Sequence, residues 1–145
     1  MGVRRVLPLV RPPFGPRLGA TLGLLLAAAI AGDARAQSMT PMRGEVRSVS
    51  DSFAVRVFPS NPYSERIKIE VRVYDQDFYE VPAEISPQSF SLAGGASRRV
   101  TVMVPFDGRT DRKVRICTES IPFPNQQTNI RTQICGKFLG RKLAF

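Results

Sequence analysis

From residue 39 onward, apolar side chains recur at every second position of short segments, the pattern of β-strands with one buried face. The clearest segment is RIKIEVRVY at 66–74, where isoleucines and valines alternate with Lys, Glu and Arg. Clusters of Pro, Asn, Asp and Gly separate the segments and indicate turns. The pattern predicts strands near residues 40–50, 52–58, 65–75, 88–92, 97–105, 112–120 and 130–143.

Seven short alternating strands in about 105 residues, with turns about every 8 to 12 residues, are typical of an immunoglobulin-like sandwich. We therefore predict an all-β fold over residues 37–145, a single immunoglobulin-like seven-stranded β-sandwich with one disulfide. A segment of this length forms one domain around one core.

The first 36 residues have a different pattern, that of a secretory signal peptide. Arginines precede an apolar stretch at 18–31, and Ala34-Arg35-Ala36 supplies a small-x-small cleavage site. The apolar stretch is shorter than the roughly 20 residues that a spanning helix needs, so we expect no permanent membrane anchor. We predict cleavage near Ala36 and export, with the Arg4-Arg5 pair leaving the twin-arginine route open beside ordinary export.

The whole chain has 21 Lys and Arg against 12 Asp and Glu, a formal net charge of +9. Residues 1–36 contain five of the basic and one of the acidic residues, which leaves +5 on the remainder. The basic residues are scattered through the predicted strands with acids between them, which is typical of a solvated surface. Together with export, this spacing argues against a nucleic-acid partner.

The two cysteines, Cys117 and Cys135, are expected to pair because an exported chain reaches an oxidising compartment. Their separation is too wide for a CxxC redox motif. If they face each other across two antiparallel strands, Arg115 must face Lys137, and alternation places one set of apolar side chains in the core. That set is Val114, Ile116, Ile134 and Phe138.

Two like charges directly opposite each other, Arg115 and Lys137, are destabilising unless something relieves them. One interpretation is an anion-binding point that a partner's carboxylate occupies. The other is that both side chains extend into water. The residues alone leave both interpretations open.

Catalytic chemistry is poorly represented in this chain. It contains no histidine, which removes the usual general base and the commonest metal ligand. Asp75, Asp77 and Glu80 lie close together but after a strand, and we interpret them as a solvated loop. Because no phosphate loop or zinc spacing is present either, we expect no enzyme, cofactor or metal site.

Three segments resemble a known family, the periplasmic pilus-assembly chaperones, and specifically their N-terminal immunoglobulin-like domain. Residues 39–43 (MTPMR) resemble its first strand, and residues 67–75 resemble its third strand. Residues 85–97 (ISPQSFSLAGGAS) resemble the segment that precedes a strand like Arg99 to Val104, and are the most specific match. The chain ends at Phe145, so we expect the family's second domain to be missing.

The resemblance implies a periplasmic location and a protein partner, a pilus or envelope subunit. In that family the last strand of this domain is lent to a subunit by β-strand addition. A basic residue on the first strand and a lysine on the last hold the subunit's C-terminal carboxylate, and the matching positions are Arg43 and Lys137. Some members also carry a disulfide like Cys117–Cys135.

Three hypotheses follow for function. The first is a periplasmic chaperone-like protein that binds an extended subunit segment along an exposed last strand. The second is a structural or adhesive sandwich domain of the envelope without chaperone activity. The third is an accessory module that binds an anionic ligand through Arg43, Arg115 and Lys137.

Overall fold

The structure is a computed structural model that describes residues 37–121 and 131–144. Every regular element in this part of the chain is a β-strand. None of its segments is a helix long and apolar enough to cross a membrane. The predicted signal peptide and its cleavage site at Ala36 lie outside the described residues.

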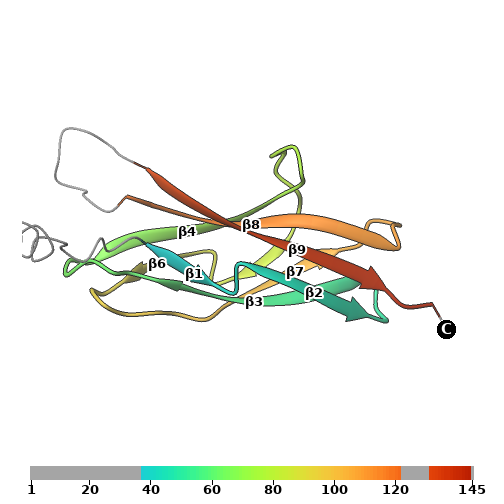
Figure 1. Ribbon diagram of the computed structural model, residues 1–145, viewed down its shortest axis with the longest axis horizontal. Helices are drawn as coiled ribbons and strands as arrows, with labels where there is room; N and C mark the ends of the chain where they lie inside the picture. Colours follow the sequence, from blue (N-terminus) through green and yellow to red (C-terminus); the bar gives the residue numbers. More distant parts are fainter. Residues whose placement is uncertain (1–36, 122–130, 145) are drawn as a thin grey trace, which may run out of the picture. The chain divides into compact units, whose positions relative to one another are not determined.

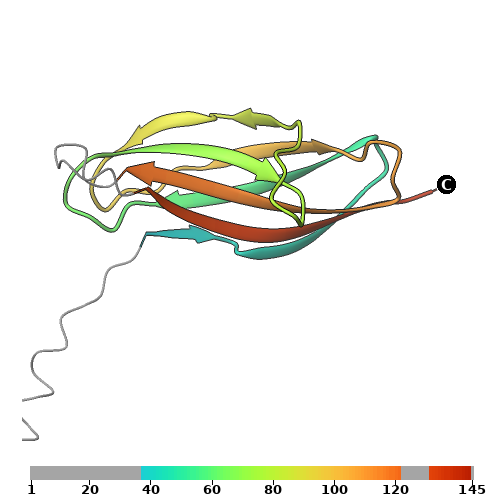
Figure 2. The same cartoon turned by 90° about the horizontal axis from the view of Figure 1, so that it is seen from above.

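The strands form two sheets that pack face to face, as Figures 1 and 2 show. In the four-stranded sheet the order is β1 (Ser38–Thr40), β3 (Ser52–Ser60), β7 (Val100–Pro105) and β5 (Glu84–Ser86). In the five-stranded sheet the order is β2 (Arg43–Ser48), β9 (Thr132–Lys142), β8 (Asp111–Ile121), β4 (Ile67–Tyr74) and β6 (Ser89–Leu92). The predicted all-β sandwich is confirmed.

The strand count differs from the predicted seven in two places. The segment predicted as one strand at 40–50 is two: β1 pairs antiparallel with β3, whereas β2 pairs parallel with β9 in the other sheet. Pro41 lies at the change, and its missing N–H prevents the ladder from continuing. The second difference is β5, a three-residue strand between Pro82 and Pro87 that was not predicted because alternation over three residues gives no signal.

The core lies between the sheets and is built from the alternating positions that the sequence predicted. On β4, the four apolar residues at alternate positions from Ile67 to Val73 are at most 1% exposed. Burying such side chains stabilises by roughly 1.5 to 3 kcal/mol each. The other large apolar side chains that are fully buried are Met39, Phe53, Val57, Val100, Val102, Val104, Phe106 and Ile116.

The β8–β9 register is the predicted one. Cys117 faces Cys135 at a Cα–Cα distance of 4.0 Å and forms the disulfide, and Arg115 faces Lys137. Val114, Ile116 and Phe138 are buried, and Ile134 is half-buried against the core.

Two glycines on β9 interrupt the apolar alternation of the strand for a steric reason. A Cβ on Gly140 would overlap the ring of Phe53, and a Cβ on Gly136 would crowd Phe138 and Met39. The core already fills the space that larger side chains at these positions would need.

Candidate functional site

Three basic residues form a row across the outer face of the five-stranded sheet. Because β2 runs parallel to β9, Arg43 is the direct neighbour of Lys137 on one side. Because β8 runs antiparallel to β9, Arg115 is its direct neighbour on the other side. The structure therefore brings together all three residues that the sequence and the resemblance singled out for partner binding.

The row borders a hollow of about 580 Å³, which we call the basic groove. Glu45 is the one acidic side chain among its described lining residues, and it already pairs with Arg47 at 3.5 Å and Arg141 at 3.3 Å. The lining consists of Arg43, Gly44, Glu45, Gln76, Lys113, Val114, Arg115, Lys137, Phe138 and Leu139.

Lys113 is a fourth cation of the basic groove, and sequence reasoning missed it. The signal was available: Lys113 precedes Arg115 by two residues on one strand, so both side chains lie on the same face. No carboxylate lies within ion-pair distance of Arg43, Lys113, Arg115 or Lys137 in the described part of the chain.

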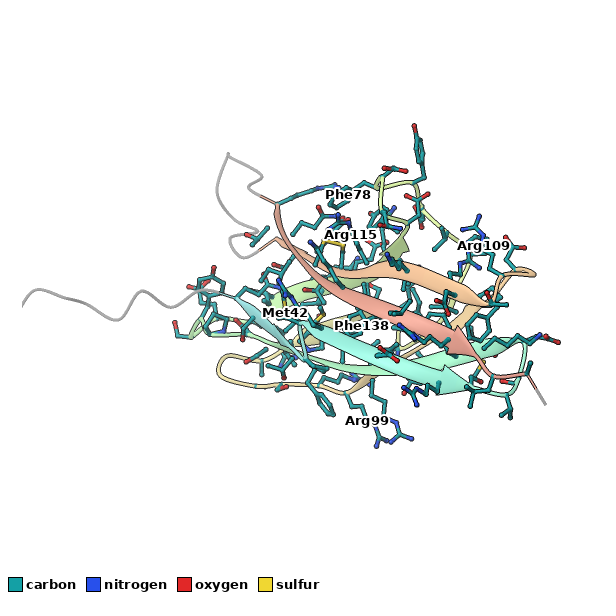
Figure 3. All side chains as sticks on the ribbon, turned by 45° about the vertical axis from the view of Figure 1, so that its right-hand side comes forward. Met42, Phe78, Arg99, Arg109, Arg115 and Phe138 are labelled. Carbon is teal, nitrogen blue, oxygen red and sulfur yellow. A yellow bond between two sulfur atoms is a disulfide. The ribbon has the colours of Figure 1, made fainter. Side chains whose placement is uncertain are left out.

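Arg115 contacts the loop between β4 and β5 instead of extending into water. Its Nε and Nη2 atoms donate to the carbonyl of Gln76, at 3.4 and 3.3 Å. Its guanidinium carbon lies 4.5 Å from the ring centre of Phe78, a cation–π contact that Figure 3 shows beside the sheet. The interpretation that the side chain extends freely into water is therefore wrong for Arg115.

The loop that holds Arg115 is closed by Asp75. One carboxylate oxygen of Asp75 accepts from the backbone N–H groups of Asp77 and Tyr79, both at 2.9 Å. Phe78 takes a positive φ of 64°, a conformation that bulky residues rarely adopt. The loop is solvated, as the sequence interpretation expected, since residues 76–80 are exposed, and Asp75 in addition organises a turn that aims an aromatic ring at Arg115.

The free edge of β9 is shorter than the sequence hypothesis assumed. β2 pairs with β9 from Lys137 to Lys142, so this half of the last strand is not exposed. Over Thr132–Gly136, no described strand pairs with β9 on the side away from β8. Because the N–H of Lys137 points to the β2 side, where it donates to Met42, alternation directs the peptide groups of Gln133 and Cys135 to the same side.

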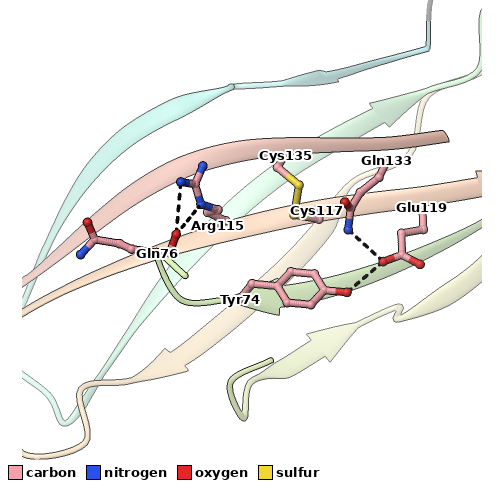
Figure 4. Close-up of a disulfide and its surroundings, with 7 residues drawn as sticks. All are labelled: Tyr74, Gln76, Arg115, Cys117, Glu119, Gln133 and Cys135. Atoms are coloured by element: carbon pink, nitrogen blue, oxygen red, sulfur yellow. Dashed lines mark hydrogen bonds between the residues drawn. A yellow bond between two sulfur atoms is a disulfide. The ribbon is translucent and has the colours of Figure 1, made fainter. Parts of the chain in front are cut away.

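The disulfide lies on the outer face next to a hydrogen-bonded cluster, shown in Figure 4. The Tyr74 hydroxyl donates to Glu119 at 2.9 Å, and the Gln133 amide donates to the same oxygen at 3.1 Å. Burial raises the pKa of Tyr74 above its usual 10.0, and the hydrogen bond to Glu119 adds to this effect. The disulfide thus separates a cluster of paired side chains from the basic groove.

Neither a protein-family model nor a curated protein sequence matches the chain. Solved structures do match, and they define the class of fold, which is a PapD-like, immunoglobulin-like sandwich. Domain 7 of human CEP192, a PapD-like domain, aligns with a TM-score of 0.55 at 12% identity over 98% of each chain.

Within that class, the matches include periplasmic pilus chaperones. The E. coli chaperone DraB aligns with a TM-score of 0.60 at 18% identity, over 74% of this chain and 55% of DraB. The SafB chaperone, solved in complex with Salmonella enterica SafA pilin, gives a TM-score of 0.62 at 17% identity, over 77% of this chain and 57% of that one. The chain thus spans little more than half the length of these chaperones. It has the fold of a fimbrial-chaperone domain, as the sequence resemblance predicted.

Proposed function

We propose that the protein is a periplasmic, chaperone-like protein that binds an extended segment of a pilus or envelope subunit by β-strand addition. The segment pairs with the free edge of β9 at Thr132–Gly136, and its terminal carboxylate is held by Arg43 and Lys137 with Arg115 beside them. The signal peptide at 1–36 delivers the protein to the periplasm, and the protein has no catalytic role.

The observation that supports this proposal is that an unpaired strand edge and a row of cations lie next to each other on β9. The peptide groups of Gln133 and Cys135, which no described strand pairs, are followed two residues later by Lys137, the middle cation of the row. An added strand gains main-chain hydrogen bonds along such an edge, and a charged group at its end fixes its register.

The fold supports the same proposal. SafB was solved with a pilin, and the chaperone CsuC of Acinetobacter baumannii was solved with the tip subunit CsuE. Both are proteins of this fold in complex with a pilus subunit. By analogy of fold, this chain takes a protein partner of the same kind.

A peptide titration tests the proposal. The peptide carries the C-terminal sequence of a fimbrial subunit and is made with a free carboxylate or as the amide. The free acid should bind more tightly than the amide, and Arg43→Ala or Lys137→Ala should remove about 1.5 to 3 kcal/mol of binding free energy, the scale of a hydrogen bond to a charged group. Lys68→Ala, on the exposed face of β4, is the matched control. Equal binding by all three variants, with intact melts, would contradict the carboxylate clamp.

The alternative function is a structural or adhesive envelope domain without chaperone activity. Two observations favour it: β2 already covers Lys137–Lys142, and the same fold occurs in the CEP192 domain and in the C. elegans MSP family member WR4. A chain that binds no subunit peptide but self-associates at low micromolar concentration in sedimentation would support this alternative.

A further inference from the structure

Two cations of the basic groove are not used by the proposed carboxylate clamp. Lys113 and Arg115 lie two residues apart on β8, so their Cα atoms are about 7 Å apart on the same face. Both line the groove, where Glu45 is already engaged by Arg47 and Arg141. The groove therefore carries more positive charge than one carboxylate neutralises.

Arg115 is held in place before any ligand arrives. The carbonyl of Gln76 accepts hydrogen bonds from the Nε and Nη2 atoms of Arg115, and the ring of Phe78 covers one face of the guanidinium. A guanidinium has five N–H donors, so these contacts leave several free to bind an anion. Because the side chain is already ordered, binding loses less conformational entropy than it would with a free arginine.

We infer that Lys113 and Arg115 form a second anion subsite, which binds an acidic side chain close to the C-terminus of the same partner segment. The inference rests on the proposed function, since the terminal carboxylate occupies Arg43 and Lys137. Arg115 is the direct neighbour of Lys137, and Lys113 faces Leu139, two residues beyond it, so the side chain of the segment's last residue can enter the hollow between them. Lys113 and Arg115 thereby determine specificity, and Phe78 is a positioning residue that acts through Arg115.

The shape of the surface favours a peptide over an anionic bilayer. The four cations line a hollow, which an extended chain can enter and a flat layer of headgroups cannot follow. Beside the hollow, β9 offers peptide groups at Gln133 and Cys135 that no other described strand pairs, and these match a polypeptide backbone and no lipid group.

The test compares two free-acid peptides that differ only in Glu or Gln as the C-terminal residue. On the native chain, the Glu peptide should bind about threefold to tenfold more tightly, the range between an exposed ion pair and a charge-assisted hydrogen bond. In Lys113→Gln/Arg115→Gln this preference should fall to about one, whereas the preference for the free acid over the amide persists. Lys68→Gln should keep both preferences.

Phe78→Leu tests the positioning role separately. It should reduce the Glu preference and leave the free-acid preference and the thermal melt close to native, because Leu cannot provide the aromatic face that holds Arg115. An unchanged Glu preference in this variant would overturn the positioning role of Phe78.

The remaining outcomes separate the two proposals. Native chain that prefers the free acid but does not distinguish Glu from Gln would overturn the second subsite and leave the proposed function intact. No binding of any peptide would overturn both. Binding to phosphatidylglycerol vesicles that is lost in Lys113→Gln/Arg115→Gln, without a Glu preference, would replace the peptide with a lipid surface.

Discussion

Two regions of the outer face of the five-stranded sheet carry similar side chains but differ in how their charges are satisfied. Around β4, which we call the paired region, Arg72 bonds Glu70 at 2.9 Å and Glu80 at 3.3 Å, and Tyr74 bonds Glu119. In the basic groove, four cations have no acidic partner among the described residues. In the paired region the charged side chains bind other side chains of the same chain, whereas those in the groove remain available to a ligand.

The largest effect should come from the disulfide, which lies between the two regions. Cys117→Ala/Cys135→Ala should lower the free energy of unfolding by roughly 3 kcal/mol, the chain-entropy value for a loop of this length. Urea unfolding of the oxidised native chain and the variant measures it. Superimposable curves would show that the β8–β9 register holds without the covalent link.

In the paired region, Tyr74→Phe should cost about 0.5 to 1.5 kcal/mol, because it removes the hydrogen bond to Glu119. The raised pKa of Tyr74 also predicts a pH dependence. The folded state keeps the phenol proton longer than the unfolded state, so this stability is fully present below pH 10.0 and is lost as the pH rises through the folded pKa. Melts from pH 8 to 11 should show a weaker alkaline decline in Tyr74→Phe, and identical declines would contradict the assignment.

A smaller loss is expected for Arg72→Ala. Its hydrogen bond to Glu70 raises the pKa of the guanidinium, and Glu80 adds to this effect. All three side chains are partly exposed, so removing both ion pairs should cost about 0.4 to 1 kcal/mol. In chemical denaturation, high salt should reduce the difference in the free energy of unfolding between Arg72→Ala and the native chain.

The smallest expected effect has the opposite sign and distinguishes the groove from the paired region. Lys137→Ala removes one cation of a row in which like charges are direct neighbours, so it should stabilise the free domain by a few tenths of a kcal/mol. Chemical denaturation of Lys137→Ala and Arg72→Ala in the same experiment measures both changes in the free energy of unfolding. A loss of stability in Lys137→Ala would mean that the groove is internally compensated like the paired region.

Much of this arrangement could be predicted from the sequence, because one disulfide fixes a whole antiparallel register. Pairing Cys117 with Cys135 was enough to place Arg115 opposite Lys137. The position of Arg43 came only from the family resemblance, because strand alternation does not say which sheet a segment joins. For the same reason the change of sheet at Pro41 was missed.

The contact between Phe78 and Arg115 could not be predicted from spacing. It depends on a turn closed by the carboxylate of Asp75 and on the positive φ of Phe78, neither of which has a periodic signal. Lys113, in contrast, could have been found by extending the alternation of β8 by two residues. The contact made by the loop therefore has no signal in the sequence, whereas Lys113 lies on a face that strand alternation predicts.

The change of sheet at Pro41 also bears on aggregation. An unpaired strand edge is a template for any other chain with a free edge, including a second copy of this protein. Because β2 joins β9 as soon as the chain has passed Pro41 and Met42, the unpaired stretch of β9 in the described part of the chain is confined to Thr132–Gly136 and ends at Lys137. Two copies pairing antiparallel there, with Gln133 of one opposite Cys135 of the other, would set each Lys137 opposite the other copy's Arg131, whereas a segment with a terminal carboxylate would meet opposite charge. This stretch of β9 thus discourages two copies from pairing through it while leaving it open to an anionic strand.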